Sequence, residues 1–524
     1  MKRLIILTLI TLPGVSAAQV LEWSYTLGGS GNGWDLPNKV LLDDDGGVYV
    51  VGTVFNSDSK EDIVLIKLDT SGNQKWIYTY DGSVYREDKS SDMVLDGHGN
   101  IYITGYSNAD STPQCDLIVI KLDTSGTEKW VYLYDVDTID TSREYGYSLA
   151  LDSSGNIYTV GRVSYPAFYG GAFLVMSLDS SGALRWSWVY SHDNTDFSAC
   201  EWHQATKVIT DLARGVYVAG CLVDSGWVSV YAQVFVVLKF DTSGSILWKN
   251  WGLDCSEGEY CPAFMELGSD GLLYGVTSGR GGYSCLPYYF GLDTATGFGW
   301  ERRMMLQGDE DIKDMGLSDG GLYSCGEWVN NPYYGSGFVV SRVSLVGELL
   351  WETVFVVDTP FATSCANDLA FNAGGDIFAV GDTGDHALAV KLDSSLKNAG
   401  WTYDWPDTSA FRSVAMDPFG GIYIAGWRRD SAGNNDILVI KLRDSLATAK
   451  EPNPSARIPE RMTLSVAPSG FLISGYEGPV QVYDATGRLI LIREIKEKSL
   501  IGPLNPGVYF VAAGKQRGRV AVLR

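Results

Sequence analysis

One pattern recurs along most of the chain, and no other sequence feature limits the fold as strongly. In its clearest copy, residues 95–105 read LDGHGNIYITG, residues 116–126 read DLIVIKLDTSG, and Trp130 follows. The aromatic residue of the first segment occurs eight times, at Tyr49, Tyr102, Tyr158, Tyr217, Tyr274, Tyr323, Phe378 and Tyr423. A unit of this length cannot bury its apolar surface alone, so it must stack on its neighbours.

Each copy contains four short runs with β-strand character. In the second copy these are an apolar stretch ending at Asp96, the segment around Tyr102, the segment around Val119, and a segment centred on Trp130. Four strands in a unit of about 50 residues are typical of a propeller blade. The sequence therefore predicts an all-β fold, an eight-bladed β-propeller over residues 19–443.

The spacing of tryptophans predicts how the ring closes. The eighth copy ends at Arg443 without a Trp of its own, whereas Trp23 lies near the N-terminus without the rest of a copy. We expect the N-terminal strand to be the outer strand of the last blade, which removes exposed edges. The eight repeat tryptophans, expected to pack between blades, are Trp23, Trp76, Trp130, Trp186, Trp248, Trp300, Trp351 and Trp401.

The turns of the repeat have the form Asp-x-x-Gly, as at residues 152–155. Asp caps such a turn with its side chain, and Gly adopts the positive φ that the turn requires. An acidic calcium loop is the alternative, but the EF-hand spacing is absent. We predict hairpin turns here, with no metal site.

The copies at 151–158 (LDSSGNIY) and 119–123 (VIKLD) resemble the bacterial SBBP-type β-propeller repeat. The likeness covers roughly residues 20 to 443. The segment from Asp293 to Trp300 also looks like the tryptophan-docking motif of quinoproteins, in which the Trp packs between blades. Neither resemblance names a substrate.

The N-terminus predicts export. Residues 1–18 combine Lys2 and Arg3 with a short apolar run and small residues at Ser16, Ala17 and Ala18, which is the pattern of a secretory signal peptide. No later segment is apolar enough to span a membrane, so no transmembrane anchor is expected. We expect a monomer located outside the cell or on its outer surface. The net charge of −23 disfavours nucleic acid as a partner.

The cysteines and histidines predict disulfides and no cofactor. Eight cysteines in an exported chain allow up to four disulfides. The pairs that join neighbouring loops are Cys200 with Cys221, and Cys325 with Cys365. No CxxC or histidine motif has the spacing of metal ligands.

The long connections predict where a ligand binds. In a four-stranded blade, the connections between the second and third strands share one face with those between blades, and here they are long and irregular. Aromatic side chains in such loops suit stacking on sugar rings or anchoring a protein, or they pack together to order the loops. The predicted ligand-binding residues are Trp202, Trp227, Trp328, Tyr333 and Trp427.

Charged residues on the same face leave an enzyme as the alternative. Acidic residues such as Glu87, Asp88, Asp135 and Glu144 crowd it, but no single carboxylate pair stands out for glycoside hydrolysis. A sialidase-like site would add arginines, for which the loop positions offer Arg86, Arg143, Arg302 and Arg412. A quinoprotein-like redox propeller is the third class. We predict no catalytic residues.

A second module follows the repeat. Residues 444–460 contain Pro452 and Pro454 and read as a linker, and residues 461–524 contain short β runs, enough for a small β-sandwich. The segments VYDATGRL (482–489) and LNPGVYFV (504–511), followed by a basic last strand, resemble the type A C-terminal sorting domain of the type IX secretion system. The resemblance implies that residues 461–524 engage the type IX secretion machinery. The sequence thus predicts a non-catalytic surface or secreted scaffold that binds a glycan or a surface protein.

Overall fold

The computed structural model describes most of residues 19–524, and in this part all regular elements are β-strands. It does not describe residues 1–18, 58–59, 83–85, 109–114, 137–141, 166–169, 191–202, 212–214, 224–232, 255–262, 279–286, 305–308, 319, 330–335, 357–363, 397–398, 445–462, 468–469, 475–477, 484–488, 496–498, 502–506, 514–515 and 523–524. The predicted signal peptide and nearly all of the predicted linker lie among them. The described residues include no helix long and apolar enough to cross a membrane. The chain divides into two compact units, Met1–Leu446 and Ala447–Arg524.

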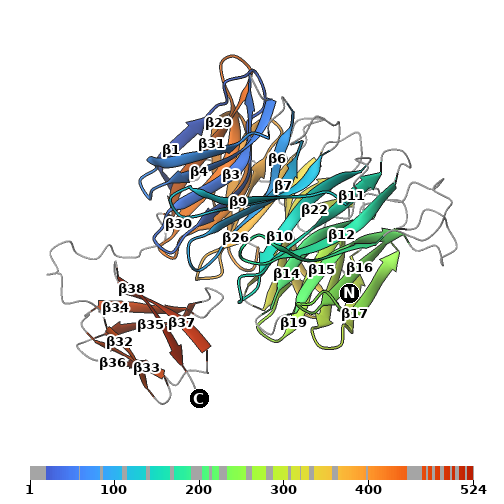
Figure 1. The fold of residues 1–524 in the computed structure, drawn as a ribbon. Coiled ribbons are helices and arrows are strands. Elements are labelled where there is room, and N and C mark those ends of the chain that lie inside the picture. The colour runs from blue at the N-terminus through green and yellow to red at the C-terminus, as the bar shows by residue number, and fades with distance from the viewer. Residues whose placement is uncertain are drawn as a thin grey trace. The chain divides into compact units, whose positions relative to one another are not determined.

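Six sheets of the first unit share one topology, in which four consecutive strands pair antiparallel in chain order (Figure 1). The first three sheets are β2 (Leu36–Leu42), β3 (Val48–Asn56), β4 (Lys60–Leu68) and β5 (Gln74–Tyr80); β6 (Asp88–Leu95), β7 (Ile101–Ser107), β8 (Asp116–Leu122) and β9 (Glu128–Tyr134); β10 (Arg143–Leu151), β11 (Ile157–Tyr165), β12 (Gly170–Leu178) and β13 (Leu184–Tyr190). The next three are β14 (Gln204–Thr210), β15 (Val216–Val223), β16 (Gln233–Phe240) and β17 (Ile246–Asp254); β18 (Ala263–Leu267), β19 (Leu272–Ser278), β20 (Pro287–Asp293) and β21 (Gly299–Arg303); β22 (Asp309–Ser318), β23 (Gly321–Val329), β24 (Ser336–Ser344) and β25 (Leu349–Val356).

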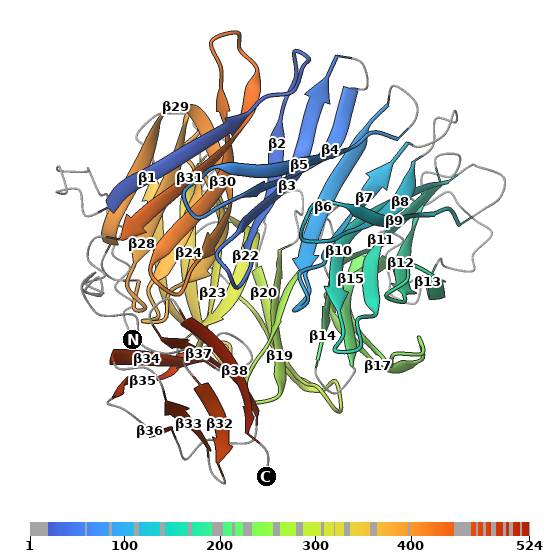
Figure 2. The same ribbon diagram turned by 60° about the vertical axis from the view of Figure 1, so that its left-hand side comes forward.

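The last sheet of the first unit has seven strands in the order β1-β31-β30-β29-β28-β27-β26. They are β1 (Gln19–Leu27), β26 (Cys365–Phe371), β27 (Ile377–Asp382), β28 (His386–Leu392), β29 (Ala399–Met416), β30 (Gly421–Arg429) and β31 (Asn435–Asp444). The long strand β29 pairs with β28 through its first half and with β30 through its second half. The N-terminal strand β1 pairs antiparallel with β31, with Trp23 opposite Lys441 (Figure 2).

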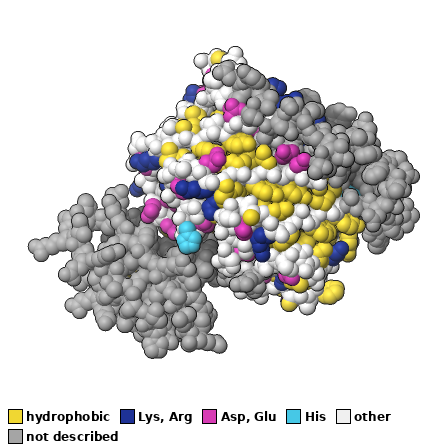
Figure 3. Space-filling model, viewed as in Figure 1, with side chains coloured by type: hydrophobic (Ala, Val, Ile, Leu, Met, Phe, Trp, Pro, Cys, Tyr) yellow, Lys and Arg dark blue, Asp and Glu magenta, His cyan; other side chains and the backbone are white. Residues whose placement is uncertain are grey.

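Apolar clusters join each sheet to the next. The second and third strands are continuous apolar runs, such as VYVVGTVFN in β3, and are buried on both faces because a sheet lies on either side. The fourth strand β5 alternates half-buried and exposed positions. On the face shown in Figure 3, hydrophobic side chains form a broad band. One cluster joins Val50 and Val64 of the first sheet to Ala425 and Val439 of the last.

Polar side chains on the first strands bond the backbone of the neighbouring sheet. In several of these first strands, a polar side chain at one position accepts a hydrogen bond from a backbone N–H of the next sheet. The donor is the residue directly after the one at the same position in that sheet. The bonds run from Leu149 N to Asp92 Oδ2 (3.1 Å), Val208 N to Ser148 Oγ (3.5 Å), Leu369 N to Asp314 Oδ2 (3.2 Å), Val414 N to Asp368 Oδ2 (2.8 Å) and Val40 N to Ser413 Oγ (3.2 Å). The last of these links the first sheet to the seven-stranded sheet.

The repeat tryptophans lie between sheets. Each of five indoles donates its N–H to a turn carbonyl of the adjacent sheet and covers a glycine of that turn. The donor and acceptor pairs are Trp23 with Thr70, Trp76 with Thr124, Trp130 with Ser180, Trp186 with Thr242 and Trp248 with Thr294, at 3.0, 3.1, 3.4, 3.0 and 3.1 Å. Trp300 covers Gly347 in the same way. Trp351 packs against the cluster that contains Tyr323, and Trp401 is buried and donates to Asp444.

The turn chemistry predicted at residues 152–155 is confirmed. Asp152 Oδ1 accepts the N–H groups of Ser154 and Asn156 at 2.8 and 3.0 Å, and Gly155 has φ of 79°. The repeat tyrosine Tyr158 donates its hydroxyl to the other oxygen of Asp152 at 2.9 Å. The same Tyr-to-Asp bond recurs at Tyr49, Tyr102, Tyr217 and Tyr423, so in these copies the spacing of Asp and Tyr ties the turn to the strand that follows it.

The second unit contains two antiparallel sheets in the described residues, one of three strands and one of four. The strands are β32 (Thr463–Ala467), β33 (Gly470–Ser474), β34 (Gly478–Tyr483), β35 (Leu489–Ile495), β36 (Ser499–Ile501), β37 (Gly507–Ala513) and β38 (Gln516–Val522). The side chains described in this unit are Val480 and Val482, both buried.

Candidate functional site

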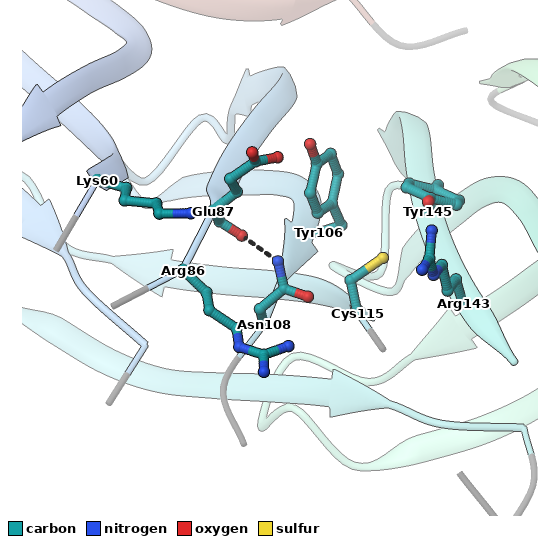
Figure 4. Close-up of a pocket in the computed structure, with 8 residues that line it drawn as sticks. All are labelled: Lys60, Arg86, Glu87, Tyr106, Asn108, Cys115, Arg143 and Tyr145. Atoms are coloured by element: carbon teal, nitrogen blue, oxygen red, sulfur yellow. Dashed lines mark hydrogen bonds between the residues drawn. The ribbon is translucent and has the colours of Figure 1, made fainter. Parts of the chain in front are cut away.

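A pocket of about 420 Å³ lies where the first three sheets meet. Its lining residues come from strand ends and from the connections between them, on the face that the sequence predicts to bind ligand. They are Lys60, Arg86, Glu87, Tyr106, Asn108, Cys115, Arg143 and Tyr145 (Figure 4).

The pocket gathers positive charge in an acidic protein. Among the described lining residues, Lys60, Arg86 and Arg143 stand beside one carboxylate, Glu87. The whole chain has 40 Lys and Arg against 63 Asp and Glu. A local excess of cations in such a chain attracts an anionic ligand, because nearby charges dominate over distant, screened ones.

One pocket residue has a strained backbone. Lys60 begins β4 with φ of 83°, in the left-handed backbone region that residues other than glycine rarely adopt. Such a conformation costs about 1–2 kcal/mol and occurs preferentially at functional sites. The strain places an exposed lysine at the rim of the pocket.

Asn108 and Glu87 form one wall of the pocket. Asn108 donates its side-chain N–H to the backbone oxygen of Glu87 at 2.9 Å (Figure 4). Lys89 approaches the Glu87 carboxylate at 3.7 Å and that of Glu61 at 2.8 Å. The wall is therefore held by bonds between the first two sheets.

Two tyrosines and a cysteine form the opposite side. The rings of Tyr106 and Tyr145 meet edge to face with centroids 5.1 Å apart. Burial raises the pKa of Tyr145 to about 12 and that of the Cys115 thiol to about 12. Cys115 is thus a thiol at neutral pH, which is unlike an activated nucleophile. The tyrosines offer ring surface and hydroxyl groups to a ligand.

In the sequence, Glu144 stands between the pocket residues Arg143 and Tyr145, and its side chain is buried, with the residue 1% exposed. Burial raises its pKa from 4.5 to about 8, and the charges of Asp135 and Asp116 add to the shift. The folded state therefore holds a proton that the unfolded chain releases. The stabilisation that this raised pKa provides is complete below pH 4.5, the pKa of the unfolded chain. It is lost as the pH rises to the folded pKa of about 8.

We expect Glu144→Gln to be more stable than the natural protein at pH above 8, by up to about 5 kcal/mol, because glutamine cannot ionise. The free energies of unfolding of the two proteins should converge near pH 4.5. Urea unfolding across this range checks the difference. Parallel pH profiles for the two proteins would contradict it.

Five residues were predicted to bind ligand. The two of them that the structure describes do not line this pocket. Trp202, Trp227 and Tyr333 lie outside the described residues. Trp328 is 6% exposed in β23, and Trp427 is half-buried in β30, with their indole nitrogens buried. The prediction placed both in loops, but the strands extend further and turn these side chains into the protein.

The predicted disulfide between Cys325 and Cys365 is absent, and both are free thiols. Cys325 is in the middle of β23 inside an apolar cluster, whereas Cys365 begins β26 and directs its thiol to the Ala366 carbonyl at 3.5 Å. Cys200 lies outside the described residues, so its pairing with Cys221 stays a prediction.

Sequence reasoning found part of the pocket. Arg86, Arg143 and Glu87 stood among the loop-face charges, whereas Arg302 and Arg412 lie on other sheets, in β21 and β29. Tyr106 and Tyr145 were missed because they belong to strands. Their position at strand ends next to long connections is the signal that could have found them.

Comparison with known proteins agrees with the fold. Residues 80–111 match the family described as the SBBP β-propeller repeat. A solved structure described as the Dos1 propeller is 14% identical, with a TM-score of 0.51, covering 81% of this chain and 95% of that one. The chain is a β-propeller repeat protein. Its four-stranded sheets are the blades.

Other solved structures are more distant. A protein of unknown function from Bacteroides caccae is 10% identical with a TM-score of 0.32, covering 58% of this chain and 93% of that one. The polysaccharide lyase Uly1 is 11% identical with a TM-score of 0.40, covering 78% and 89%. No curated protein matches the sequence. At these TM-scores neither likeness carries a conclusion about this chain.

Proposed function

We propose that this β-propeller is an extracellular, non-catalytic scaffold that binds an acidic glycan in the pocket between its first three blades. The observation that carries the proposal is the convergence of Lys60, Arg86 and Arg143 on one pocket of a chain whose net charge is −23. Guanidinium groups bind carboxylate and sulfate groups with paired hydrogen bonds, and tyrosine rings stack on sugars.

The proposed scaffold has eight blades and is closed by the N-terminal strand. Six four-stranded sheets account for six blades, and the two halves of β29 divide the seven-stranded sheet into two more. The bonds from Trp23 to Thr70 and from Val40 to Ser413 support closure, because each joins the first blade to the last.

Export is proposed from sequence motifs. Residues 1–18 have the pattern of a signal peptide, and residues 461–524 resemble the type A sorting domain that engages the type IX secretion machinery. We propose that the protein crosses the outer membrane and is released or retained on the cell surface. Its glycan-binding face is then available to extracellular polymers.

A hydrolytic function receives less support. Glycoside hydrolysis commonly uses two carboxylates flanking the bond. Glu87 is the one carboxylate among the lining residues described for the pocket. Binding without turnover therefore fits this pocket better than hydrolysis.

The test measures the binding of the purified protein to immobilised polygalacturonate and alginate, with neutral dextran as the matched control. We expect saturable binding to the acidic polymers that weakens as salt is added. Mass spectrometry of the bound polymers would reveal any cleavage. Equal binding to dextran, or cleavage products, would contradict the proposal.

We expect Arg86→Ala and Arg143→Ala each to weaken this binding by about 10–100-fold, because a hydrogen bond to a charged group contributes about 1.5–3 kcal/mol. Arg302→Ala, on β21 outside the pocket, is the matched control and should bind as the natural protein does. Surface plasmon resonance with polygalacturonate gives the three affinities. Equal losses in all three variants would indicate non-specific charge attraction.

A further inference from the structure

Three carboxylates converge beside the pocket at the junction of the first two blades. Asp62 is in β4, Asp81 follows β5, and Asp88 begins β6. One oxygen of each lies within 4.8 Å of an oxygen of the others. Asp62 and Asp88 are 2% and 1% exposed, and Asp81 is exposed to solvent.

The backbone fixes Asp88 in this position. Gly82 N donates to Asp88 Oδ2 at 2.7 Å, and Asn108 N donates to Asp88 Oδ1 at 3.1 Å. Each carboxylate oxygen has a second lone pair, so both remain able to bind another partner. The carboxylate is therefore oriented in advance.

Like charges face one another in the cluster. Burial raises the pKa of Asp88, and the charge of Asp62 raises it further; the same two causes raise the pKa of Asp81. Among the described residues, no basic side chain forms an ion pair with Asp81 or Asp88. Buried carboxylates without a compensating cation are costly.

A buried hydroxyl points to the same place. Ser107 is 0% exposed, and its Oγ lies beside the Asp88 carboxylate and the Tyr80 hydroxyl but makes no hydrogen bond of regular geometry among the described residues. A Cβ built on Gly82 would lie 2.7 Å from this Oγ and 3.0 Å from Asp88 Oδ1, so the hydroxyl adjoins the Asp88 carboxylate. Native proteins rarely leave a buried hydroxyl unsatisfied, unless an ion or water is missing.

The equivalent junction between the last and first blades differs at two of the four positions. There Asp35 accepts N–H groups from Gly29 and Phe55, both at 2.6 Å, as Asp88 does from Gly82 and Asn108. Asp436 faces it, as Asp62 faces Asp88, but Gly28 stands where Asp81 would be and Val54 where Ser107 would be. Among the described residues, only the first-to-second junction brings three carboxylates together.

We propose that Asp62, Asp81 and Asp88, with the Ser107 hydroxyl, bind a calcium ion that bridges the first and second blades. Calcium takes oxygen ligands at about 2.3–2.6 Å, so oxygens on opposite sides of the ion are about 5 Å apart. One oxygen of each carboxylate lies within 4.8 Å of the others, so a single ion can contact all three. The site does not depend on glycan binding.

The ion would stabilise the pocket wall. Asn108, which bonds Asp88 through its backbone, bonds Glu87 through its side chain, and both line the pocket. Occupancy of the site thus orders residues that also face the glycan.

The test titrates calcium chloride into the full chain after removal of divalent ions with EDTA, using isothermal titration calorimetry. We expect one site with a dissociation constant on the order of 10⁻⁴–10⁻³ M or tighter, as in extracellular calcium modules. The melting temperature should rise on addition of calcium. Terbium luminescence sensitised by Tyr80, next to Asp81, reports the site independently.

The deciding variant is Asp81→Asn, because Asp81 is exposed and its change should leave folding intact. Its calcium affinity should fall at least tenfold, and its melting temperature in EDTA should match that of the natural protein. Asp436→Asn, at the junction without a third carboxylate, is the matched control and should bind calcium normally. Absence of saturable binding by the natural protein, or equal binding by Asp81→Asn, would overturn the proposal. Failure of polygalacturonate binding alone would leave it standing, since the two measurements use different ligands.

Discussion

Replacing Trp23 with alanine should lower the free energy of unfolding by about 3 kcal/mol, as for a large side chain removed from a packed interface. Trp23 donates to Thr70 O at 3.0 Å and covers Gly72, whose added Cβ would lie 2.6 Å from the indole. Its ring also meets that of Tyr423, with centroids 6.1 Å apart. All three contacts join β1 to the first or last blade and disappear together in the variant.

Urea unfolding followed by circular dichroism measures this loss. Trp76→Ala is the matched comparison, since Trp76 makes the same contacts between the first two blades. Leu21→Ala, in the same strand but 40% exposed, is the control and should change stability by less than about 0.5 kcal/mol. If Trp23→Ala is as mild as Leu21→Ala while Trp76→Ala is severe, the proposed closure by the N-terminal strand is wrong.

Replacing Asp92 with alanine should cost about 3–5 kcal/mol, because it leaves a lysine without its buried partner. Lys39 Nζ lies 2.6 Å from Asp92 Oδ1, and Asp92 Oδ2 accepts the Ser148 hydroxyl at 3.2 Å and the Leu149 N–H at 3.1 Å. One carboxylate thus joins first strands of three successive blades, β2, β6 and β10.

The effect of Asp92 should depend on pH in a defined direction. Burial acts to raise its pKa, but the charges of Lys39 and Lys207 and its hydrogen bonds outweigh this, and the pKa is lowered. A carboxylate whose pKa is lowered by folding stabilises the protein at pH values above its unfolded pKa of about 3.9. This stabilisation is lost as the pH falls through the pKa of the folded state. The natural protein and Asp92→Ala should therefore differ most near neutral pH and less in acid.

A double-mutant cycle isolates the pair. The double variant Lys39→Met with Asp92→Ala should be less destabilised than the sum of Lys39→Met and Asp92→Ala, because neither charge is left without its partner. Urea unfolding at neutral and acidic pH gives all the values. A double variant as unstable as the sum of the single variants would show that the ion pair contributes no coupling.

Much of the first unit could be read from local sequence. The alternation of apolar and polar residues predicts the strands, and Asp152 with Gly155 predicts a turn, because these properties depend on neighbours only a few residues away. The partner of the N-terminal strand could also be predicted, since one copy lacked its Trp and Trp23 lacked its copy. In contrast, the ends of β23 and β30 were misjudged, since burial and not local pattern decides how far a strand continues.

The β-strand repeat, its turns and the tryptophans between blades are encoded locally, because each follows from residue types at fixed spacing. The meeting of charged groups depends instead on how the sheets pack. Arg86 and Arg143 share a pocket, and Asp62, Asp81 and Asp88 share a junction, because neighbouring sheets bring together residues that are far apart or unremarkable in sequence. The raised pKa of Glu144 arises in the same way, since it depends on burial and on the charges of Asp135 and Asp116. Distances of a few ångströms between separate strands control these properties, and sequence spacing does not encode them.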